Sequence, residues 1–133
     1  MPVLSDYTTI LGHNDEVNVG EGQFPNGWET KFNTGGRRTN GDALFTFMMR
    51  GMTETNQHAR VLVNGVEVGR LFNNKGDILG HWQTQIVPFP NNRLNDGDNV
   101  IRVSSVDKIN PVGGDTRDNF ILRSVFCFFK QEA

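Results

Sequence analysis

The chain contains a single cysteine, Cys127, so no disulfide can form within it and its fold does not depend on an oxidising compartment. This cysteine lies in the apolar run FCFF, where a small buried hydrophobic side chain is its usual role. No apolar run is long enough to cross a bilayer, and the stretch MPVLSDYTTI lacks the basic and apolar regions of a signal peptide. The sequence therefore predicts a soluble protein with no membrane insertion, and it leaves the compartment open.

Clustered charge and catalytic motifs are also missing. The formal net charge is -2 and the basic residues are scattered, so we expect no nucleic-acid partner. The sequence contains no GxSxG elbow, no GxxxxGK[ST] phosphate loop and no CxxC pair. The histidines His13, His58 and His81 lie far apart and do not have metal-ligand spacing. These absences favour a binding protein that is not an enzyme and requires no cofactor.

Glycine and phenylalanine are abundant, with 15 and 10 residues among 133, which is typical of short strands joined by many turns. A chain of this length forms one domain, here residues 1–133. Asn64-Gly65 predicts a type I′ hairpin and Asp96-Gly97 a second tight reversal. Strands are predicted over residues 7–11, 28–33, 43–50, 58–63, 66–72, 81–87, 99–106 and 119–130. The fold class is therefore all-β, a single-domain antiparallel β-sandwich of about eight strands.

Two predicted strands are apolar on both faces, although a sandwich strand normally exposes one face to water. In residues 43–50, Ala43, Phe45, Phe47 and Met49 oppose Leu44 and Met48. In residues 119–130, strict alternation places Phe120, Leu122, Phe126 and Phe128 opposite Ile121, Val125 and Phe129. The second face needs a cover. This cover is either residues 12–41, which we expect to be mostly loop, or another subunit of a homo-oligomer that associates through the last strand.

The order of VNGVEVG (63–69), a strand with Trp82, LNDGDNVIRVSSV (94–106) and DNFILRSV (118–125) resembles the jelly rolls of the galactose-binding-like superfamily. This superfamily includes carbohydrate-binding modules and accessory sugar-binding domains of glycoside hydrolases. The resemblance covers about residues 43–129, and its most specific element is the pattern Leu94, Gly97, Asn99, Ile101, Val103. In physical terms, these residues serve the fold, because Leu94 can plug the sandwich edge and Asn99 can bond the turn backbone.

The resemblance implies an eight-stranded jelly roll that is usually non-catalytic and often holds a structural calcium ion. Its ligands are held by loops at one end or on a concave sheet face. It points to Asp42 and Asp118, each just before a strand, as the calcium candidates. Asx turns or strand-entry caps are the alternative role for both residues.

The sugar-binding candidates are aromatic and amide side chains near loops. Trp28 follows PNG in residues 12–41 and is a candidate for stacking on a sugar ring, or else for anchoring that segment to the core. Trp82 alternates with Thr84 and Ile86 and is predicted to be core. His81, Gln83 and Gln85 would then form a solvent-facing polar strip. A second polar loop presents Asn73, Asn74 and Lys75.

The leading functional prediction is a non-catalytic, lectin-like carbohydrate-binding module whose partner is a glycan. The resemblance and the polar loops favour it. The alternative is a structural, self-assembling jelly-roll subunit of a virion, tail or filament, which the doubly apolar strands favour.

Overall fold

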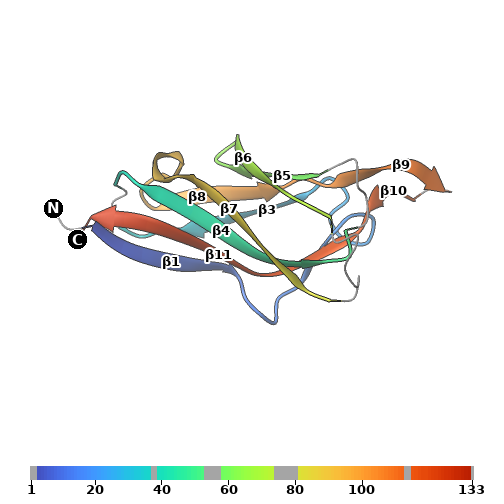
Figure 1. Cartoon of the computed structure of the whole chain (residues 1–133), viewed down its shortest axis with the longest axis horizontal. Coiled ribbons are helices and arrows are strands. Elements are labelled where there is room, and N and C mark those ends of the chain that lie inside the picture. The colour runs from blue at the N-terminus through green and yellow to red at the C-terminus, as the bar shows by residue number, and fades with distance from the viewer. Residues whose placement is uncertain (1–2, 37–38, 53–57, 74–80, 113–114, 133) are drawn as a thin grey trace.

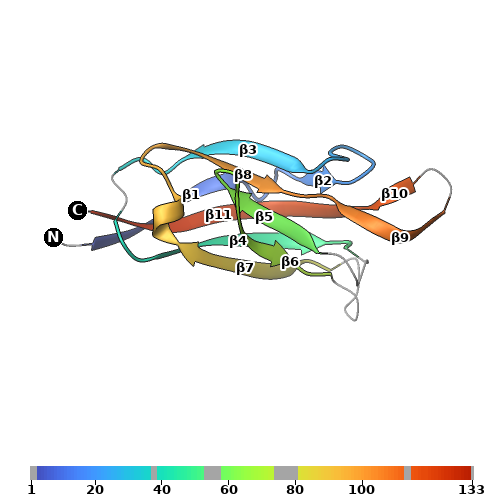
Figure 2. The same ribbon diagram turned by 90° about the horizontal axis from the view of Figure 1, so that it is seen from above.

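The computed structural model describes residues 3–36, 39–52, 58–73, 81–112 and 115–132, and within them it consists of antiparallel strands in two layers (Figure 1). One layer has the strand order β1-β11-β4-β7, with β2 also paired to β11, and the other has the order β3-β8-β5-β6. A ribbon of β9 and β10 extends beyond one end of the sheets, away from the two termini (Figures 1 and 2). The predicted all-β sandwich is therefore confirmed.

The strands are β1 (Val3–Leu11), β2 (Val17–Val19), β3 (Trp28–Asn33), β4 (Asp42–Arg50), β5 (Ala59–Val63), β6 (Val66–Leu71), β7 (Gln83–Pro90), β8 (Asp98–Val103), β9 (Val106–Val112), β10 (Asp115–Asp118) and β11 (Phe120–Glu132). A short 3-10 helix (Asn91–Arg93) joins β7 to β8. In the described part of the chain, no helix is long and apolar enough to cross a membrane.

The core lies between the two sheets and is built by alternation along the strands. In β4, Ala43, Phe45, Phe47 and Met49 are buried, as predicted for one face of this strand. The Phe45 ring centroid lies 6.0 Å from that of Phe32 on β3, so the two layers meet through aromatic contact. Burial of these large side chains, at about 25 cal/mol per Å² of apolar surface, is the main stabilising contribution expected for such a sandwich.

Both predicted reversals are present. Asn64 and Gly65 have φ values of 51° and 84° and join β5 to β6, where Val63 pairs with Val66. Gly97 has a φ of 85°. Asn99 is buried beside it, accepts the N–H of Asn95 at 2.7 Å and donates to the Gly97 carbonyl at 3.0 Å. The pattern that carries the family resemblance therefore stabilises a turn, as its physical interpretation predicts.

Strict alternation fails in β11, because the strand contains a β-bulge. Two residues lie between Arg123 and Phe126 on β11, whereas only one lies between their partners Met48 and Thr46 on β4. Ser124 occupies the bulge with a φ of 51°. The extra residue exchanges the two faces of the strand.

Because of the bulge, the buried and outward faces of the last strand differ from those predicted. Phe120 and Leu122 are buried before it, and Val125, Cys127 and Phe129 are buried after it. Phe126 and Phe128 therefore do not share the core face of Phe120 and Leu122 but point to the outer side of the sheet.

Residues 12–41 are less loop-like than predicted. They contain β2, which pairs with the start of β11, and β3, which forms one edge of the second sheet. This segment therefore does not cover the outer face of the first sheet, where Tyr7 and Phe128 remain exposed. The strand predicted over residues 99–106 is also interrupted, because β8 ends at Val103 and β9 begins at Val106.

Candidate functional site

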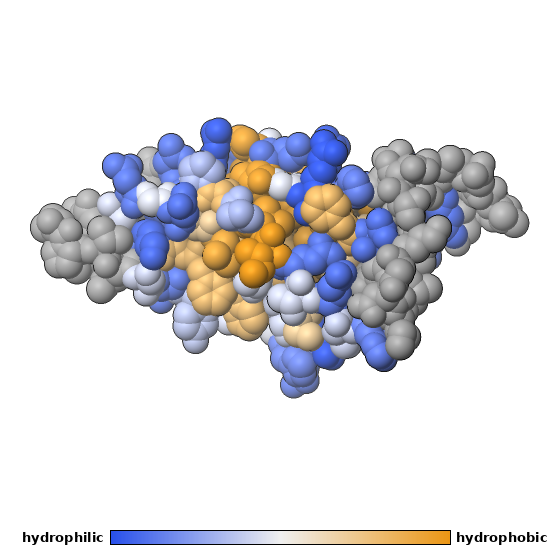
Figure 3. All heavy atoms as spheres, viewed as in Figure 1, coloured by the Kyte–Doolittle hydropathy of each residue, from blue (hydrophilic) through white to orange (hydrophobic). Residues whose placement is uncertain are grey.

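The outer face of the sheet β1-β11-β4-β7 carries an apolar surface built by two cross-strand rows. The rows are Tyr7–Phe128–Leu44–Pro88 and Thr9–Phe126–Thr46–Ile86. Figure 3 shows hydrophobic side chains gathered over the middle of this side of the molecule, with hydrophilic ones around them. Opposed residues on neighbouring strands lie within side-chain contact, so the rows form a continuous surface.

Three aromatic rings form one part of this surface, which we call the aromatic face: Tyr7, Phe126 and Phe128. Tyr7 is 60% exposed and Phe128 is 41% exposed. Their ring centroids lie 5.8 Å apart with an angle of 33° between the planes, and Phe126 lies 6.4 Å from each. Rings held by a sheet lose little side-chain entropy when a ligand stacks on them.

A hollow of about 300 Å³ lies beside Tyr7 and Phe128 and has polar groups at its rim. It is lined by Ser5, Asp6, Tyr7, Asp42, Leu44, Phe128, Phe129 and Lys130.

Hydrogen bonds hold two of the rim side chains in place. Asp6 accepts from the Gln131 amide at 2.8 Å, and the Lys130 ammonium donates to the Ser5 hydroxyl at 2.5 Å. The hollow thus combines an aromatic wall with two carboxylates and an ammonium group, which suits a ligand with one apolar and one hydroxylated side.

Trp28 does not form an exposed stacking platform. It is the first residue of β3, pairs with Val103 of β8, and is only 4% exposed. Its indole contributes to the hydrophobic core, so the alternative role as an anchor is the one that the structure supports. The expectation of an exposed ring was wrong because the side chain at the first position of this strand points into the core between the sheets.

The two faces of the strand around Trp82 are the reverse of those predicted. Trp82 is only partly buried, and the guanidinium carbons of Arg123 and Arg50 lie 3.9 and 4.8 Å from its ring centroid. Thr84 and Ile86 are exposed on the same outer side, whereas Val87 and Phe89 are buried. Trp82 is therefore a surface residue stabilised by cation–π contacts and does not belong to the core.

The predicted polar strip is divided between two environments. The Gln85 side chain accepts from the Phe72 N–H at 2.8 Å and donates to the Phe72 carbonyl at 2.7 Å, which links the edges of the two sheets. The Gln83 carbonyl accepts from the Gln85 amide at 3.1 Å. Both amides are engaged within the protein, and only His81 of the three is exposed. Asn73 is partly buried, and Asn74 and Lys75 lie outside the described residues.

The calcium candidates Asp42 and Asp118 lie at opposite ends of the first sheet. Asp42 begins β4, whose last residue, Arg50, pairs with Ile121 just after Asp118. Eight residue steps of a strand cover roughly 26 Å, so these carboxylates cannot bind one ion together. Among the residues that the structure describes, no group of three or more His, Cys, Asp or Glu side chains could hold a metal ion.

Sequence reasoning did not select Tyr7 or Phe128 as site residues. The two side chains come from opposite ends of the chain and meet because β1 pairs with β11. Strict alternation places Phe128 on the same face as Phe120, and the bulge at Ser124 reverses this placement. The available signal was the doubly apolar character of residues 119–130, which indicated that one apolar face would remain outside the core.

No protein-family model and no curated protein sequence matches the chain. Several solved structures do resemble it. One is an isomalto-dextranase of Arthrobacter globiformis T6 complexed with panose, which is 11% identical with a TM-score of 0.51. The match covers 92% of this chain and 20% of the isomalto-dextranase chain. This match shows that the chain shares its fold with a part of the isomalto-dextranase.

Carbohydrate-binding modules are also among the similar jelly rolls. A family 35 carbohydrate-binding module from Clostridium thermocellum is 20% identical over 90% of this chain and 98% of its own, with a TM-score of 0.48. A CBM35 structure from Paenibacillus barcinonensis is 16% identical over 86% of this chain and 97% of its own, with a TM-score of 0.46.

Proposed function

We propose that this jelly roll is a non-catalytic, lectin-like carbohydrate-binding module and that Tyr7 and Phe128 form its sugar-stacking site. The observation that carries the proposal is the hollow in which these two exposed rings lie beside hydrogen-bonding side chains. The isomalto-dextranase that shares the fold was solved with an oligosaccharide, which is in keeping with this function.

The chemistry of the hollow fits a pyranose. One side of the sugar ring presents C–H groups that pack on an aromatic face, and its hydroxyls need hydrogen-bond partners at the edge. Tyr7 and Phe128 supply the rings, while Asp6 and Asp42 supply acceptors at the rim. Lys130 supplies a donor whose position is fixed by Ser5.

The test is a glycan array followed by titration of the best-binding glycan. Tyr7→Ala and Phe128→Ala should each weaken its binding about tenfold, because loss of one stacking ring removes about 0.5–1.5 kcal/mol in addition to the apolar area that it buries. Both variants should keep the melting temperature of the wild type within a few degrees, since these side chains are well exposed.

Ile86→Ala is the matched control, because Ile86 is 60% exposed on the same outer face but does not line the hollow. It should bind the glycan as the wild type does. If the wild-type protein retains no glycan on a broad array, the carbohydrate function is rejected.

A self-assembling structural subunit is the second candidate. The continuous apolar surface of the two cross-strand rows favours it, since exposed apolar patches of this kind often mark contacts between proteins. The two functions differ in a measurable way. A binding module retains glycan as a monomer, whereas an assembly subunit multimerises without any glycan.

A further inference from the structure

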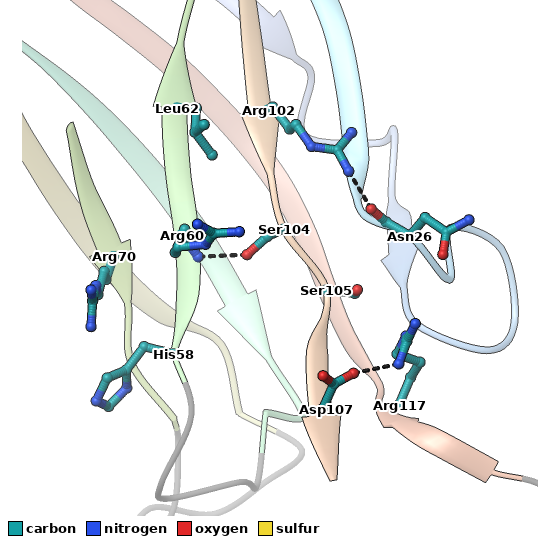
Figure 4. Close-up of a pocket in the computed structure, with 10 residues that line it drawn as sticks. All are labelled: Asn26, His58, Arg60, Leu62, Arg70, Arg102, Ser104, Ser105, Asp107 and Arg117. Atoms are coloured by element: carbon teal, nitrogen blue, oxygen red, sulfur yellow. Dashed lines mark hydrogen bonds and ion pairs between the residues drawn. The ribbon is translucent and has the colours of Figure 1, made fainter. Parts of the chain in front are cut away.

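A hollow of about 550 Å³ lies on the outer side of the second sheet (Figure 4). Its lining includes Arg60, Arg70, Arg102, Arg117, Asp107 and Ser104. These residues come from β5, β6 and β8, from the base of the β9–β10 ribbon, and from the loops beside these strands. We refer to it as the arginine pocket.

Strand alternation places the arginines on the outer side of this sheet. In β5, Ala59, Val61 and Val63 are buried, so Arg60 and Leu62 point outward. Cross-strand pairing then sets Arg70 beside Arg60 and Arg102 beside Leu62. The pocket is therefore a direct product of the fold and lies on the sheet opposite to the one that bears the aromatic face.

The charge of the pocket differs from the charge of the protein. Four arginines and one carboxylate line it, whereas the whole chain has a formal net charge of -2. Basic residues that are scattered in the sequence therefore converge in the folded molecule. Such a local excess of positive charge attracts anions, and the effect is stronger in a concave site than on a flat surface.

Two of the arginines are held in place by protein acceptors. Arg117 donates to the Pro25 carbonyl at 2.9 Å and pairs with Asp107, and Arg102 donates to the Asn26 carbonyl. These contacts fix the side of the pocket formed by the ribbon and the loop before β3 (Figure 4).

Arg60 and Arg70 are bound less tightly. Their nearest carboxylate is that of Glu67, at 3.9 and 3.8 Å, which exceeds the length of a hydrogen bond. Their side chains are 60% and 52% exposed. These two guanidinium groups can therefore turn toward a ligand without breaking a hydrogen bond to Glu67.

We propose that the arginine pocket binds a ligand that bears an oxyanion group, with Arg60, Arg70 and Arg102 as its contacts. A guanidinium presents parallel N–H donors that match two oxygens of a phosphate, sulfate or carboxylate group. The hydroxyls of Ser104 and Ser105 lie in the same pocket and can bond to further oxygens of the ligand. The ligand is either a free anion or an anionic group carried on a sugar.

This site does not depend on the proposed sugar-stacking site. The aromatic face and the arginine pocket lie on different sheets and share no lining residue. Loss of Tyr7 should leave anion binding unchanged, so failure of either proposal can be distinguished from failure of the other.

The test is calorimetric titration of the full chain at low ionic strength with inorganic phosphate, glucose 6-phosphate and glucose. We expect saturable binding of both phosphates that depends on Arg60 and Arg70, and no arginine-dependent binding of glucose. Added salt should weaken the binding of both phosphates. Tighter binding of glucose 6-phosphate than of inorganic phosphate would identify a sugar-borne anion, and equal binding would identify a free anion.

Arg60→Gln and Arg70→Gln should each weaken phosphate binding about tenfold, because each removes a charge-assisted hydrogen bond. Arg93→Gln is the matched control, since Arg93 is exposed in the 3-10 helix and does not line the pocket. It should bind phosphate as the wild type does. The proposal is overturned if the wild type binds neither phosphate at millimolar concentration, or if Arg93→Gln weakens binding as much as Arg60→Gln.

Discussion

At the residue scale, Gly97 illustrates how a single backbone conformation supports the fold. Its φ of 85° lies in the left-handed region, and a Cβ atom added there would meet only the Asn33 amide, at 3.9 Å. Space is therefore available, and the constraint on this position is conformational. Glycine adopts this region at no steric cost, whereas β-branched residues resist it.

We expect Gly97→Val to lower the free energy of unfolding by about 1–3 kcal/mol, because it forces a β-branched residue into the left-handed region. Gly97→Asn should cost much less, since asparagine tolerates this conformation. Urea denaturation of the two variants measures the difference. Equal stability of Gly97→Val and the wild type would contradict this account of the turn.

The burial of Cys127 changes the reactivity of its thiol. Burial raises the pKa of its thiol from 9.0 to about 12. The thiolate is the reactive form, so the folded protein should resist thiol reagents at pH 8 and should react once it unfolds. Rapid labelling of the folded protein would show that Cys127 is accessible.

The same shift makes stability depend on pH. Above pH 9 the unfolded thiol loses its proton while the folded thiol keeps it to about pH 12, so the unfolded state is favoured progressively in this window. The loss is at most about 1.4 kcal/mol per pH unit. The stability advantage of the wild type over Cys127→Ala should therefore shrink as the pH rises from 9 to 11, and an advantage independent of pH would contradict the prediction.

At the scale of the element, β11 combines two short alternating segments with opposite faces. Phe120 and Leu122 belong to the first, Cys127 and Phe129 to the second, and Ser124 lies between them. The bulge allows a single strand to contribute to the core along its whole length. It also directs Phe128 outward, into the hollow of the proposed sugar site.

Deleting Ser124 should leave the protein folded. The shortened strand would alternate without interruption, so Leu122, Val125, Cys127 and Phe129 would all stay on the core face. The deletion removes the hydrogen bond from the Ser124 N–H to the Gly12 carbonyl, which should cost about 1 kcal/mol of stability. Ser124→Gly is the control, because glycine accepts the observed φ of 51°. We expect both variants to be soluble and to melt cooperatively, and an insoluble or molten deletion variant would contradict the role of Ser124 as a single extra residue in the strand.

At the scale of the whole molecule, the two outer faces have different chemistry. The first sheet presents aromatic and aliphatic side chains, and the second presents the arginine pocket. Association of two copies through the first sheet would bury apolar surface without bringing the arginines together. This is consistent with the homo-oligomer predicted through the last strand, with Phe128 near the centre of the contact.

The second candidate function therefore predicts that the wild type self-associates at high concentration and that Phe128→Glu remains monomeric. Phe128 is 41% exposed, so the charge should cost little stability in the monomer. Sedimentation equilibrium measures the mass of both proteins, and thermal melting reports their stability. A wild type that stays monomeric at millimolar concentration would contradict the oligomer, and a Phe128→Glu variant that unfolds would contradict the outward position of the side chain.

The sequence by itself determined the fold class, most of the strands and both tight reversals. These features depend on local properties, such as the alternation of side chains and the backbone preference of Asn64-Gly65 or of Gly97. The same local properties determined the role of Asn99, whose partners Asn95 and Gly97 lie within four residues of it.

Only the tertiary structure decided which side chains face solvent and which meet. Trp28 is buried because β3 pairs with β8, and the rings of Tyr7 and Phe128 are neighbours because β1 pairs with β11. Each placement depends on pairing between distant segments, and a single bulge at Ser124 reverses the outcome of a correct local pattern. Because side chains alternate with a period of two, a shift of one residue exchanges core and surface, and no local signal in this chain specified that shift.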